Sequence, residues 1–385
     1  MIKSVQHQID VNLDLNQAGL LRVFLCGDVM TGRGVDQVLP YPGDPTLYES
    51  CVRDAREYVK LAENANGPIP QPVSFKYIWG EALAELERAK VDLRIINLET
   101  SITSNDEPWP DKGIHYHMHP QNVGCLTAAR ISGCSLANNH VLDWGYEGLM
   151  ETLQTLDRAG IAYAGAGHNA AEAMAPAVLE MKGKGRVLLF SFGSITSGIP
   201  REWGATSTRP GVNLLGDLSE TTARRVAGRM RQFQQPGDLI IASIHWGGNW
   251  GYEVPKEQSA FAHRLIEEGV AIAHGHSSHH VKTIEVYQNH LILYGCGDFL
   301  TDYEGIRGYE MFRGDLALMY LIQVDHHSGR LESVRMVPMQ TRRFQLNRAS
   351  AVDARWLCDL LNQLGAPLGT HMQLTEDNSM NLIWQ

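Results

Sequence analysis

The 385-residue sequence has no excess of basic residues, no closely paired cysteines and no long apolar run. Lys and Arg number 33 against 43 Asp and Glu, which gives a formal net charge of -10 at pH 7. Because proteins that bind nucleic acid or anionic membranes present a basic surface, we expect neither kind of partner. Apolar residues make up 44% and charged residues 20% of the chain, as in ordinary soluble globular proteins.

The six cysteines include no Cys-x-x-Cys pair, and most lie in apolar, strand-like or helix-like contexts. In a chain of this length, that pattern is typical of reduced thiols in a cytoplasmic protein rather than a disulfide framework. The first residues, M-I-K-S-V-Q-H-Q-I-D, lack the apolar core of a signal peptide. No later run approaches the roughly 20 apolar residues of a membrane span. We therefore expect a soluble, cytoplasmic protein with no membrane anchor in this chain.

Buried-type strands alternate with amphipathic helices along the sequence, which predicts an α/β fold. We expect strands at 21–26, 92–97, 133–137, 161–165, 238–243 and 270–273, and a hairpin over 178–192. We expect helices at 46–63, 77–90, 121–131, 148–159, 218–234 and 256–268. The helix at 46–63 lies in a proline-bounded insertion, 41–75, which we interpret as a lid or substrate-facing subdomain, or else as a helix packed on the outside. Two antiparallel strands follow at 283–287 and 291–294, and the tail contains one helix.

A histidine cluster at the end of strand 270–273 is the strongest chemical signal in the sequence. The run A-I-A-H-G-H-S-S-H-H contains His274, His276, His279 and His280, with only glycine and serine between them. Neutral imidazole is a common metal ligand, and small neighbours allow several rings to converge. The alternative is a solvated, histidine-rich loop. We favour a metal site because other strand ends carry ligand-type residues as well.

Most of those other strand ends have a structural alternative. Asp28 follows the first strand, where the alternative is a turn or N-cap aspartate. Glu99 follows the second strand. Asn139 precedes a helix that it could cap, but the neighbouring His140 adds nothing to a cap. His245 ends a later strand, where a lone histidine is usually just packed. Together these oxygen and nitrogen ligands match the needs of a two-metal hydrolytic site, with His140 protonating the leaving group or hydrogen-bonding the substrate.

Two further features are less specific. His115, His117 and His119 alternate, which places all three on one face of an extended segment. That face either lines the pocket or, as we prefer, belongs to a solvated edge strand. Arg33 binds an anion or pairs with a surface acid.

The motifs G-D-V-M-T-G-R, N-L-E-T, A-N-N-H-V-L-D-W-G-Y-E-G, G-I-A-Y-A-G-A-G, I-H-W-G, G-H-S-S-H and Y-G-C-G-D-F occur in order between Val23 and Asp302. As a set they resemble the CapA family of poly-γ-glutamate capsule biosynthesis proteins. The resemblance implies the fold of calcineurin-like metallophosphatases, a four-layer α/β/β/α sandwich. To this fold the insertion at 41–75 would add a helical lid. It also implies the metal positions Asp28, Glu99, Asn139, His245, His276 and His279. His140 matches the histidine beside the ligand asparagine in those enzymes.

The sequence departs from the family pattern at several positions. Met30 stands where phosphatases of this fold carry a histidine ligand, so we expect one metal position to be weak or absent. Ser277 replaces a histidine of the G-H-H-P-H pattern, and His274 and His280 are added outside it. Asp298 replaces a family asparagine and adds a carboxylate. Many capsule proteins of the family carry a membrane anchor, and we expect none in this chain.

Three functions follow as hypotheses. The first is a metal-dependent hydrolase of a phosphoester or an amide in capsule-type poly-γ-glutamate synthesis, using metal-activated water. The second is an epimerase that inverts an amino-acid Cα centre in a peptide natural-product precursor, with bases drawn from His140, Asp298, Cys296 and the extra histidines. The third is a non-catalytic capsule-assembly subunit that keeps a metal for structure.

From the motifs and these hypotheses we predict the cofactor, the substrate class, the domains and the site residues. The cofactor is one or two divalent ions (Mn, Zn or Fe), and the substrate is a small molecule or peptide. Homo-oligomerisation is left open. We expect one domain over 1–340 and a small C-terminal extension over 341–385. The candidate residues are, for catalysis, His140, Asp298 and Cys296; for substrate binding, Arg33, Asn138, Asp143 and Trp246; and for metal, Asp28, Glu99, Asn139, His245, His274, His276 and His279.

Overall fold

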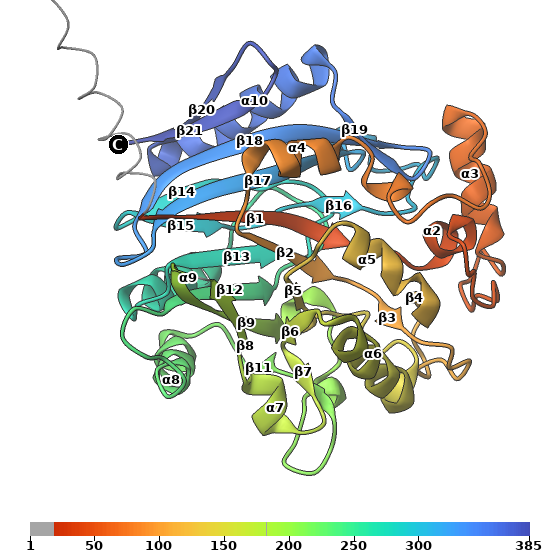
Figure 1. The fold of residues 1–385 in the computed structure, drawn as a ribbon, viewed down its shortest axis with the longest axis horizontal. Coiled ribbons are helices and arrows are strands. Elements are labelled where there is room, and N and C mark those ends of the chain that lie inside the picture. Colours follow the sequence, from red (N-terminus) through yellow and green to blue (C-terminus); the bar gives the residue numbers. More distant parts are fainter. Residues whose placement is uncertain (1–18, 182) are drawn as a thin grey trace, which may run out of the picture.

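Two large β-sheets lie face to face, and helices cover their outer faces (Figure 1). The computed structural model describes residues 19–181 and 183–385. The predicted α/β class is confirmed. The first 18 residues of the predicted domain, and Lys182 in the turn of the predicted hairpin, lie outside the described residues.

The first sheet has ten strands in the order β20-β21-β18-β17-β1-β2-β5-β6, with β16 paired to β1 and β19 paired to β18. Its strands are β1 (Leu20–Val29), β2 (Leu93–Leu98), β5 (Gly133–Ser135), β6 (Ala162–Ala164), β16 (Asp298–Leu300), β17 (Leu316–Asp325), β18 (Leu331–Arg342), β19 (Gln345–Arg348), β20 (Thr370–Leu374) and β21 (Met380–Trp384).

The second sheet has seven strands in the order β11-β9-β12-β13-β15-β14, with β8 paired to β9. Its strands are β8 (Ala177–Met181), β9 (Gly185–Ser194), β11 (Leu214–Leu215), β12 (Leu239–His245), β13 (Ile272–His276), β14 (Ile284–Tyr287) and β15 (His290–Leu293). The antiparallel pairing of β8 with β9 confirms the predicted hairpin, and that of β14 with β15 confirms the second predicted pair. Two two-stranded sheets pair β3 (Ser101–Ile102) with β4 (His117–Met118), and β7 (Ala166–Gly167) with β10 (Gly211–Val212).

The apolar strands are buried on both faces, which is why they read as continuous hydrophobic runs. On β1, Val23 and Leu25 face the core between the sheets, whereas Phe24 and Cys26 face the helices that cover the first sheet. Residues of β9 and β12 divide in the same way between the inter-sheet core and the helices over the second sheet. The helices over the first sheet are α2 (Arg33–Val38), α3 (Arg56–Asn66), α4 (Ala82–Ala89), α5 (Gly124–Ala128) and α6 (Gly145–Ala159), and those over the second are α8 (Glu220–Met230) and α9 (Lys256–Glu267).

The insertion at 41–75 differs from its prediction. The helix expected over 46–63 is α3, and it starts ten residues later. Thr46 instead pairs with Asp54 in an isolated β-bridge, and the Asp54 carboxylate accepts the backbone N–H of Arg56 at 2.9 Å. A carboxylate that receives an N–H of the first turn stabilises a helix start, so the amphipathic pattern alone placed the boundary too early.

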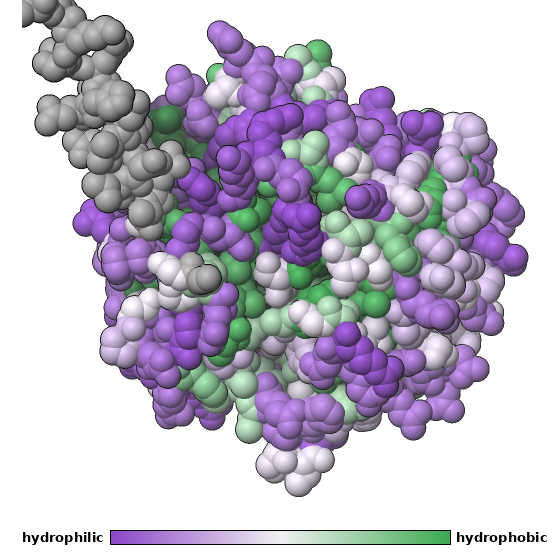
Figure 2. Space-filling view, viewed as in Figure 1, coloured by the Kyte–Doolittle hydropathy of each residue, from purple (hydrophilic) through white to green (hydrophobic). Residues whose placement is uncertain are grey.

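The C-terminal segment extends the first sheet through β21, which pairs with β18, and β20, which pairs with β21. Helix α10 (Ala351–Gly365) packs beside these strands, at the top of Figure 1, and α7 (Ala170–Met174) lies near β7. In Figure 2 hydrophilic residues cover most of the visible face, with hydrophobic residues between them. Over the described part of the chain, none of the helices has the length and apolar character needed to cross a bilayer.

Candidate metal centre

Two pairs of ligand-type residues lie side by side where the sheets meet. In the first sheet, Asp28 of β1 is in register with Asp298 of the parallel strand β16. In the second sheet, His245 at the end of β12 is in register with His276 at the end of the parallel strand β13. Asp28, His245 and His276 therefore lie at or near the carboxyl ends of their strands, where α/β sheets commonly bind ligands. Asp298 is the first residue of β16 and lies beside Asp28.

Asp28, His245 and His276 form the first group. One ligand atom from each lies within 4.8 Å of the others, and all three side chains are buried. The Nδ1 atoms of the two histidines are 2.8 Å apart, and Nδ1 of His276 is 3.8 Å from Oδ1 of Asp28. Burial, and then neighbouring histidines, lower the pKa of His245 and of His276 well below the usual value. Both imidazoles are therefore neutral.

Hydrogen bonds fix the tautomer of His276. Nε2 of His274 lies 2.8 Å from the Cys26 carbonyl oxygen, which can only accept, so this nitrogen carries the proton. Nδ1 of His274 then accepts from the Ser243 hydroxyl at 3.0 Å. The Ser243 oxygen in turn accepts from Nε2 of His276 at 2.9 Å. The inner nitrogen of His276, Nδ1, is left with a lone pair.

His245 has the same arrangement. Its Nε2 donates to the amide oxygen of Asn139 at 2.8 Å, so its Nδ1 also carries a lone pair. Two nitrogen lone pairs 2.8 Å apart repel each other unless they share a cation. Metal-binding histidines characteristically donate their other ring N–H to an acceptor, as these two do. The residues present therefore fit a divalent metal ion.

Asp28, Glu99 and Asp298 form the second group, again with ligand atoms within 4.8 Å of one another and all three buried. Asn97 donates to Oδ1 of Asp28 at 2.7 Å, which fixes the carboxylate that both groups share. Burial, and next the charge of Asp298, raise the pKa of Asp28 to about 7. Burial and the charges of Asp28 and Asp298 raise the pKa of Glu99 well above its usual value. A cation at this position would relieve the repulsion among the carboxylates.

His140 lies beside the carboxylate group. Its Nδ1 donates to Oδ2 of Asp143 at 2.6 Å, and the ammonium of Lys112 pairs with Oδ1 of Asp143 at 2.7 Å. Its Nε2 is 4.0 Å from Oε1 of Glu99. Burial, and next the charges of Lys112 and Arg33, lower the pKa of His140 well below its usual value, so the ring is neutral. The Nδ1 contact leaves the Nε2 lone pair directed toward the centre, as a general base requires.

Three residues predicted as metal ligands, Asn139, His279 and His274, belong to neither of the two groups. Asn139 holds Nε2 of His245. His279 donates from Nδ1 to Oδ1 of Asp298 at 3.0 Å. Both ring nitrogens of His274 are engaged, by Ser243 and by the Cys26 carbonyl, so the structure does not bring His274 to the groups as a ligand.

Other predicted residues lie outside the two groups. Cys296 is buried in the inter-sheet core, where burial raises the pKa of its thiol well above the usual value. The Trp246 indole donates to the Tyr294 carbonyl at 3.0 Å and lies in the core under α9, and so faces away from the centre. Asn138 donates to the Leu98 carbonyl at 2.8 Å and accepts the backbone N–H of His140 at 3.1 Å. Asn138 therefore supports the loop that carries His140.

The alternating histidines do not line the centre. His117 is in the short strand β4, with its ring 4.2 Å from that of Trp144, and His115 contacts the Trp109 carbonyl. Tyr116, on the opposite face of the same segment, is the residue that contacts His140. His115 and His117 do share a face, against Trp144, but both are buried, so the preferred prediction of a solvated edge strand is wrong. The contact with His140 comes from the residue between them.

The sequence reading also missed Ser243 and Lys112. Ser243 lies two residues before His245 on β12, so period-two alternation puts both on one face. That spacing could have identified Ser243. Lys112 lies in an irregular loop, and nothing in its local sequence indicates the contact with Asp143.

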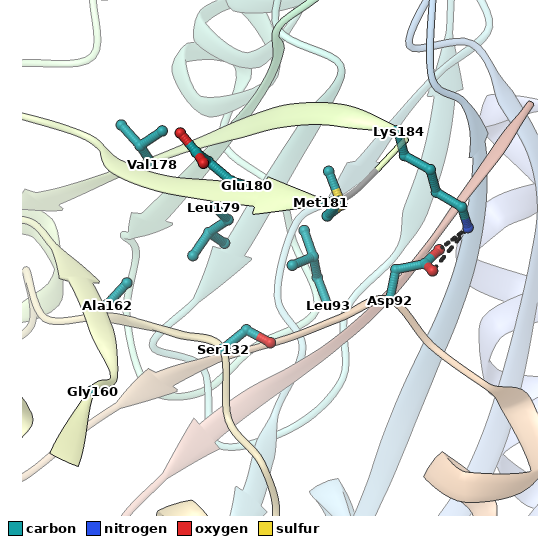
Figure 3. Close-up of a pocket in the computed structure, with 10 residues that line it drawn as sticks. All are labelled: Asp92, Leu93, Ser132, Gly160, Ala162, Val178, Leu179, Glu180, Met181 and Lys184. Atoms are coloured by element: carbon teal, nitrogen blue, oxygen red, sulfur yellow. Dashed lines mark hydrogen bonds and ion pairs between the residues drawn. The ribbon is translucent and has the colours of Figure 1, made fainter.

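A cavity of about 510 Å³ lies elsewhere, where Asp92, Ser132 and Lys184 line it together with apolar residues of β8 (Figure 3). Asp92 and Lys184 precede β2 and β9, so the cavity is at the amino ends of these strands, opposite the metal-ligand groups. The Lys184 ammonium is 2.7 Å from the Asp92 carboxylate, as the dashed lines in Figure 3 show. The charges of Asp92 and Lys184 are paired with each other, and we place the chemistry at the carboxyl ends.

Residues 22–303 match the family described as bacterial capsule synthesis protein PGA_cap. A "Probable polyglutamine synthesis accessory protein" of Mycobacterium tuberculosis (strain ATCC 25618 / H37Rv) is 46% identical over 365 residues, which is 94% of this chain and 96% of the relative. "Capsule biosynthesis protein CapA" of Bacillus anthracis is 24% identical over 73% of this chain and 60% of its own length. "PGA biosynthesis protein CapA" of Bacillus subtilis (strain 168) is 22% identical over 81% of this chain and 70% of its own length.

Proposed function

Because this chain belongs to the bacterial capsule synthesis protein family, we propose that it is a metal-dependent hydrolase of a phosphoester or amide bond in polyglutamate synthesis. The substrate context rests on the names of the relatives, which refer to polyglutamine, capsule and PGA synthesis. We further propose that the two sheets and their helices are the four-layer sandwich of calcineurin-like metallophosphatases. In this proposal 41–75 is the lid and 341–385 is a C-terminal extension.

The observation that carries the proposal is the pair of neutral imidazoles, His245 and His276, whose Nδ1 lone pairs converge beside Asp28. Divalent ions bound by these residues and by the neighbouring carboxylates would activate a water molecule and stabilise negative charge in the transition state. His140 is placed to accept the proton of that water at Nε2 and to return it to the leaving group. Asp143 holds the ring of His140 in the tautomer that this role needs.

The arrangement of bases favours hydrolysis over inversion of a carbon centre. Inversion requires a base on each side of the reacting carbon. Of the candidate bases, the Cys296 thiol lies in the inter-sheet core and the Asp298 carboxylate belongs to a metal-ligand group. His140 remains outside the two groups with its Nε2 lone pair directed at the centre, and one base serves hydrolysis.

The first test is metal content, measured by elemental analysis on protein purified without a histidine tag. We expect one or two equivalents of Mn, Zn or Fe in the wild type and a loss in His276→Ala. His263→Ala is the matched control, since His263 lies on α9 and pairs with Glu285 away from the centre. If neither wild type nor control takes up metal after incubation with Mn²⁺ or Zn²⁺, the proposal fails.

The second test is turnover by the metal-loaded protein. The substrates are γ-linked oligoglutamate, α-linked oligoglutamine and bis(p-nitrophenyl) phosphate, each incubated in deuterium oxide. Release of p-nitrophenol or shortened peptide supports a hydrolase. Deuterium at Cα of uncleaved peptide would replace hydrolysis with epimerisation. A metal-loaded protein without turnover of any of the three would instead indicate an assembly subunit.

A further inference from the structure

The shared carboxylate of Asp28 divides the centre into two halves with different donor atoms. One half contributes the imidazole nitrogens of His245 and His276, and the other contributes the carboxylate oxygens of Glu99 and Asp298. Metal ions differ in which of these donors they prefer. Imidazole suits zinc and iron, whereas positions made of carboxylates suit manganese and magnesium.

Two parallel Gly-Asp dipeptides create the oxygen half. Asp28 and Asp298 are register partners, and each follows a glycine. A Cβ on Gly27 would lie 1.6 Å from the carbonyl oxygen of Gly297, so only glycine permits this approach of the two strands. The approach brings two carboxylates to one side of neighbouring strands, a position that would be repulsive without a cation.

Asp298 itself has a carboxylate oxygen free for a ligand. His279 donates to Oδ1 of Asp298, whereas Oδ2 is buried and has no hydrogen-bond partner among the described residues. The residue is 4% exposed, so water is not readily available to that oxygen. An unpaired buried carboxylate oxygen is costly, and a bound cation would remove that cost.

The surroundings of Glu99 also leave room for a cation. Within the part of the chain that the structure describes, the ion-pair partners of Asp28, Glu99 and Asp298 are histidines. The two that face Oε1 of Glu99, Nε2 of His140 and Nε2 of His245, lie 4.0 and 3.6 Å away, beyond hydrogen-bonding distance. A cation between the carboxylates would therefore supply a contact that these histidines do not.

We propose that the centre binds two different cations: zinc or ferrous iron between Asp28, His245 and His276, and manganese or magnesium between Asp28, Glu99 and Asp298. In this arrangement Asp298 supplies the ligand that Met30 cannot, and His279 is a positioning residue that orients Asp298. The inference rests on the proposed metal centre, and it replaces the sequence expectation of a weak or absent second position.

The test is competitive loading of the metal-free protein with one equivalent each of Zn²⁺ and Mn²⁺, followed by elemental analysis and by Mn²⁺ electron paramagnetic resonance. The wild type should retain both metals. Asp298→Asn should weaken Mn²⁺ binding at least about tenfold and keep zinc, while His276→Ala should lose zinc and keep Mn²⁺. Glu151→Gln, whose carboxylate binds Thr103 and Ser104 away from the centre, should match the wild type. If Asp298→Asn keeps both affinities, or if both metals are lost together in each variant, the inference is overturned.

A measurement on the wild type does not depend on any variant folding. With zinc and Mn²⁺ both bound, pulsed electron paramagnetic resonance should detect no directly ligated ¹⁴N on Mn²⁺, because the Mn²⁺ ligands are oxygens. Strong ¹⁴N coupling would place Mn²⁺ on the histidines and would overturn the assignment. A protein that binds two zinc ions and turns over substrate would also overturn it while leaving the hydrolase proposal intact; a protein that binds no metal would overturn both.

Discussion

The phenol ring of Tyr116 lies almost parallel to the imidazole of His140, with ring centroids 3.7 Å apart and an interplanar angle of 19°. The hydroxyl of Tyr116 is 2.6 Å from that of Tyr303, and the guanidinium of Arg33 lies 4.6 Å from the Tyr116 ring centroid. Stacking on the ring face and the hydrogen bond from Nδ1 to the Asp143 carboxylate leave the His140 ring little freedom to rotate. Its Nε2 is therefore held toward Glu99, in the direction that proton transfer needs.

Replacing His140 with Gln should reduce kcat at least about 100-fold, because an amide cannot replace, as a base, the imidazole lone pair that faces Glu99. The metal content should stay at the wild-type value, since His140 belongs to neither ligand group. Steady-state kinetics and elemental analysis on the same preparations provide the check. A variant with wild-type kcat would remove His140 from the mechanism.

Asp143→Asn should lower kcat by about 10- to 100-fold at unchanged metal content, because the neutral amide no longer favours one tautomer and orientation of the imidazole. Glu151→Gln serves as the control, since it makes the same chemical change at a carboxylate away from His140. Nitrogen chemical shifts of the His140 ring should change in Asp143→Asn only. Equal activity in the two variants would contradict an orienting role for Asp143.

The sequence predicted much of this site because buried strands and their terminal residues are local features. Asp28, Glu99, His245 and His276 each follow or end an apolar run, and the structure brings all four together. The register between two strands is not a local feature. Asp28 lies beside Asp298 because β16, from a distant part of the chain, pairs with β1. Short-range sequence patterns carry no information about that pairing.

The lack of long-range information also explains why His274 and His276 were both predicted as metal ligands. His274 and His276 are two residues apart on β13 and share a face, so the sequence could not separate their roles. His274 lies deeper in the strand, where the carbonyl of Cys26 in the opposite sheet takes its Nε2. His276, at the strand end, keeps a free nitrogen. Only the position of the opposite sheet distinguishes the two.

Because of the buried His117, the free energy of unfolding should be lower in mild acid than at neutral pH. Burial is the main cause that lowers the pKa of His117 to about 4, against the opposing charges of Asp44 and Asp143. The unfolded chain takes up a proton near pH 6.5 and the folded chain does not. The free energy of unfolding therefore falls as the pH drops from about 6.5 to 4, by about 3 kcal/mol from this residue.

The measurement for His117 is urea denaturation of the metal-free protein at pH 7.5, 6 and 5, compared with His117→Gln. The buried carboxylates of Asp36 and Asp143, with pKa values raised to about 6 by burial, change stability in the opposite direction, so the difference between the two proteins is the informative quantity. That difference should shrink as the pH falls. Parallel pH profiles would show that the neutral state of His117 does not contribute.

Arg33 links the insertion at 41–75 to the centre. Removing it should lower the free energy of unfolding more than removing an arginine from an exposed ion pair. Its guanidinium donates to both carboxylate oxygens of Asp302, at 3.1 and 2.5 Å, and to Glu49 at 2.8 Å, and the residue is 4% exposed. Arg33→Met leaves two buried carboxylates without their counter-charge, which should cost about 3 to 5 kcal/mol of unfolding free energy.

Two comparisons separate the buried pair from a general effect of losing an arginine. Arg56→Met breaks the ion pair with Asp54, in which the side chains are 62% and 33% exposed, and should cost much less stability than Arg33→Met because water screens the pair. Adding Asp302→Asn to Arg33→Met removes one of the stranded charges, so the double variant should be more stable than Arg33→Met alone. Urea denaturation at pH 7.5 measures all three. If Arg33→Met and Arg56→Met lose equal stability, the buried charges are compensated by other groups, and Arg33 does not hold the insertion to the centre.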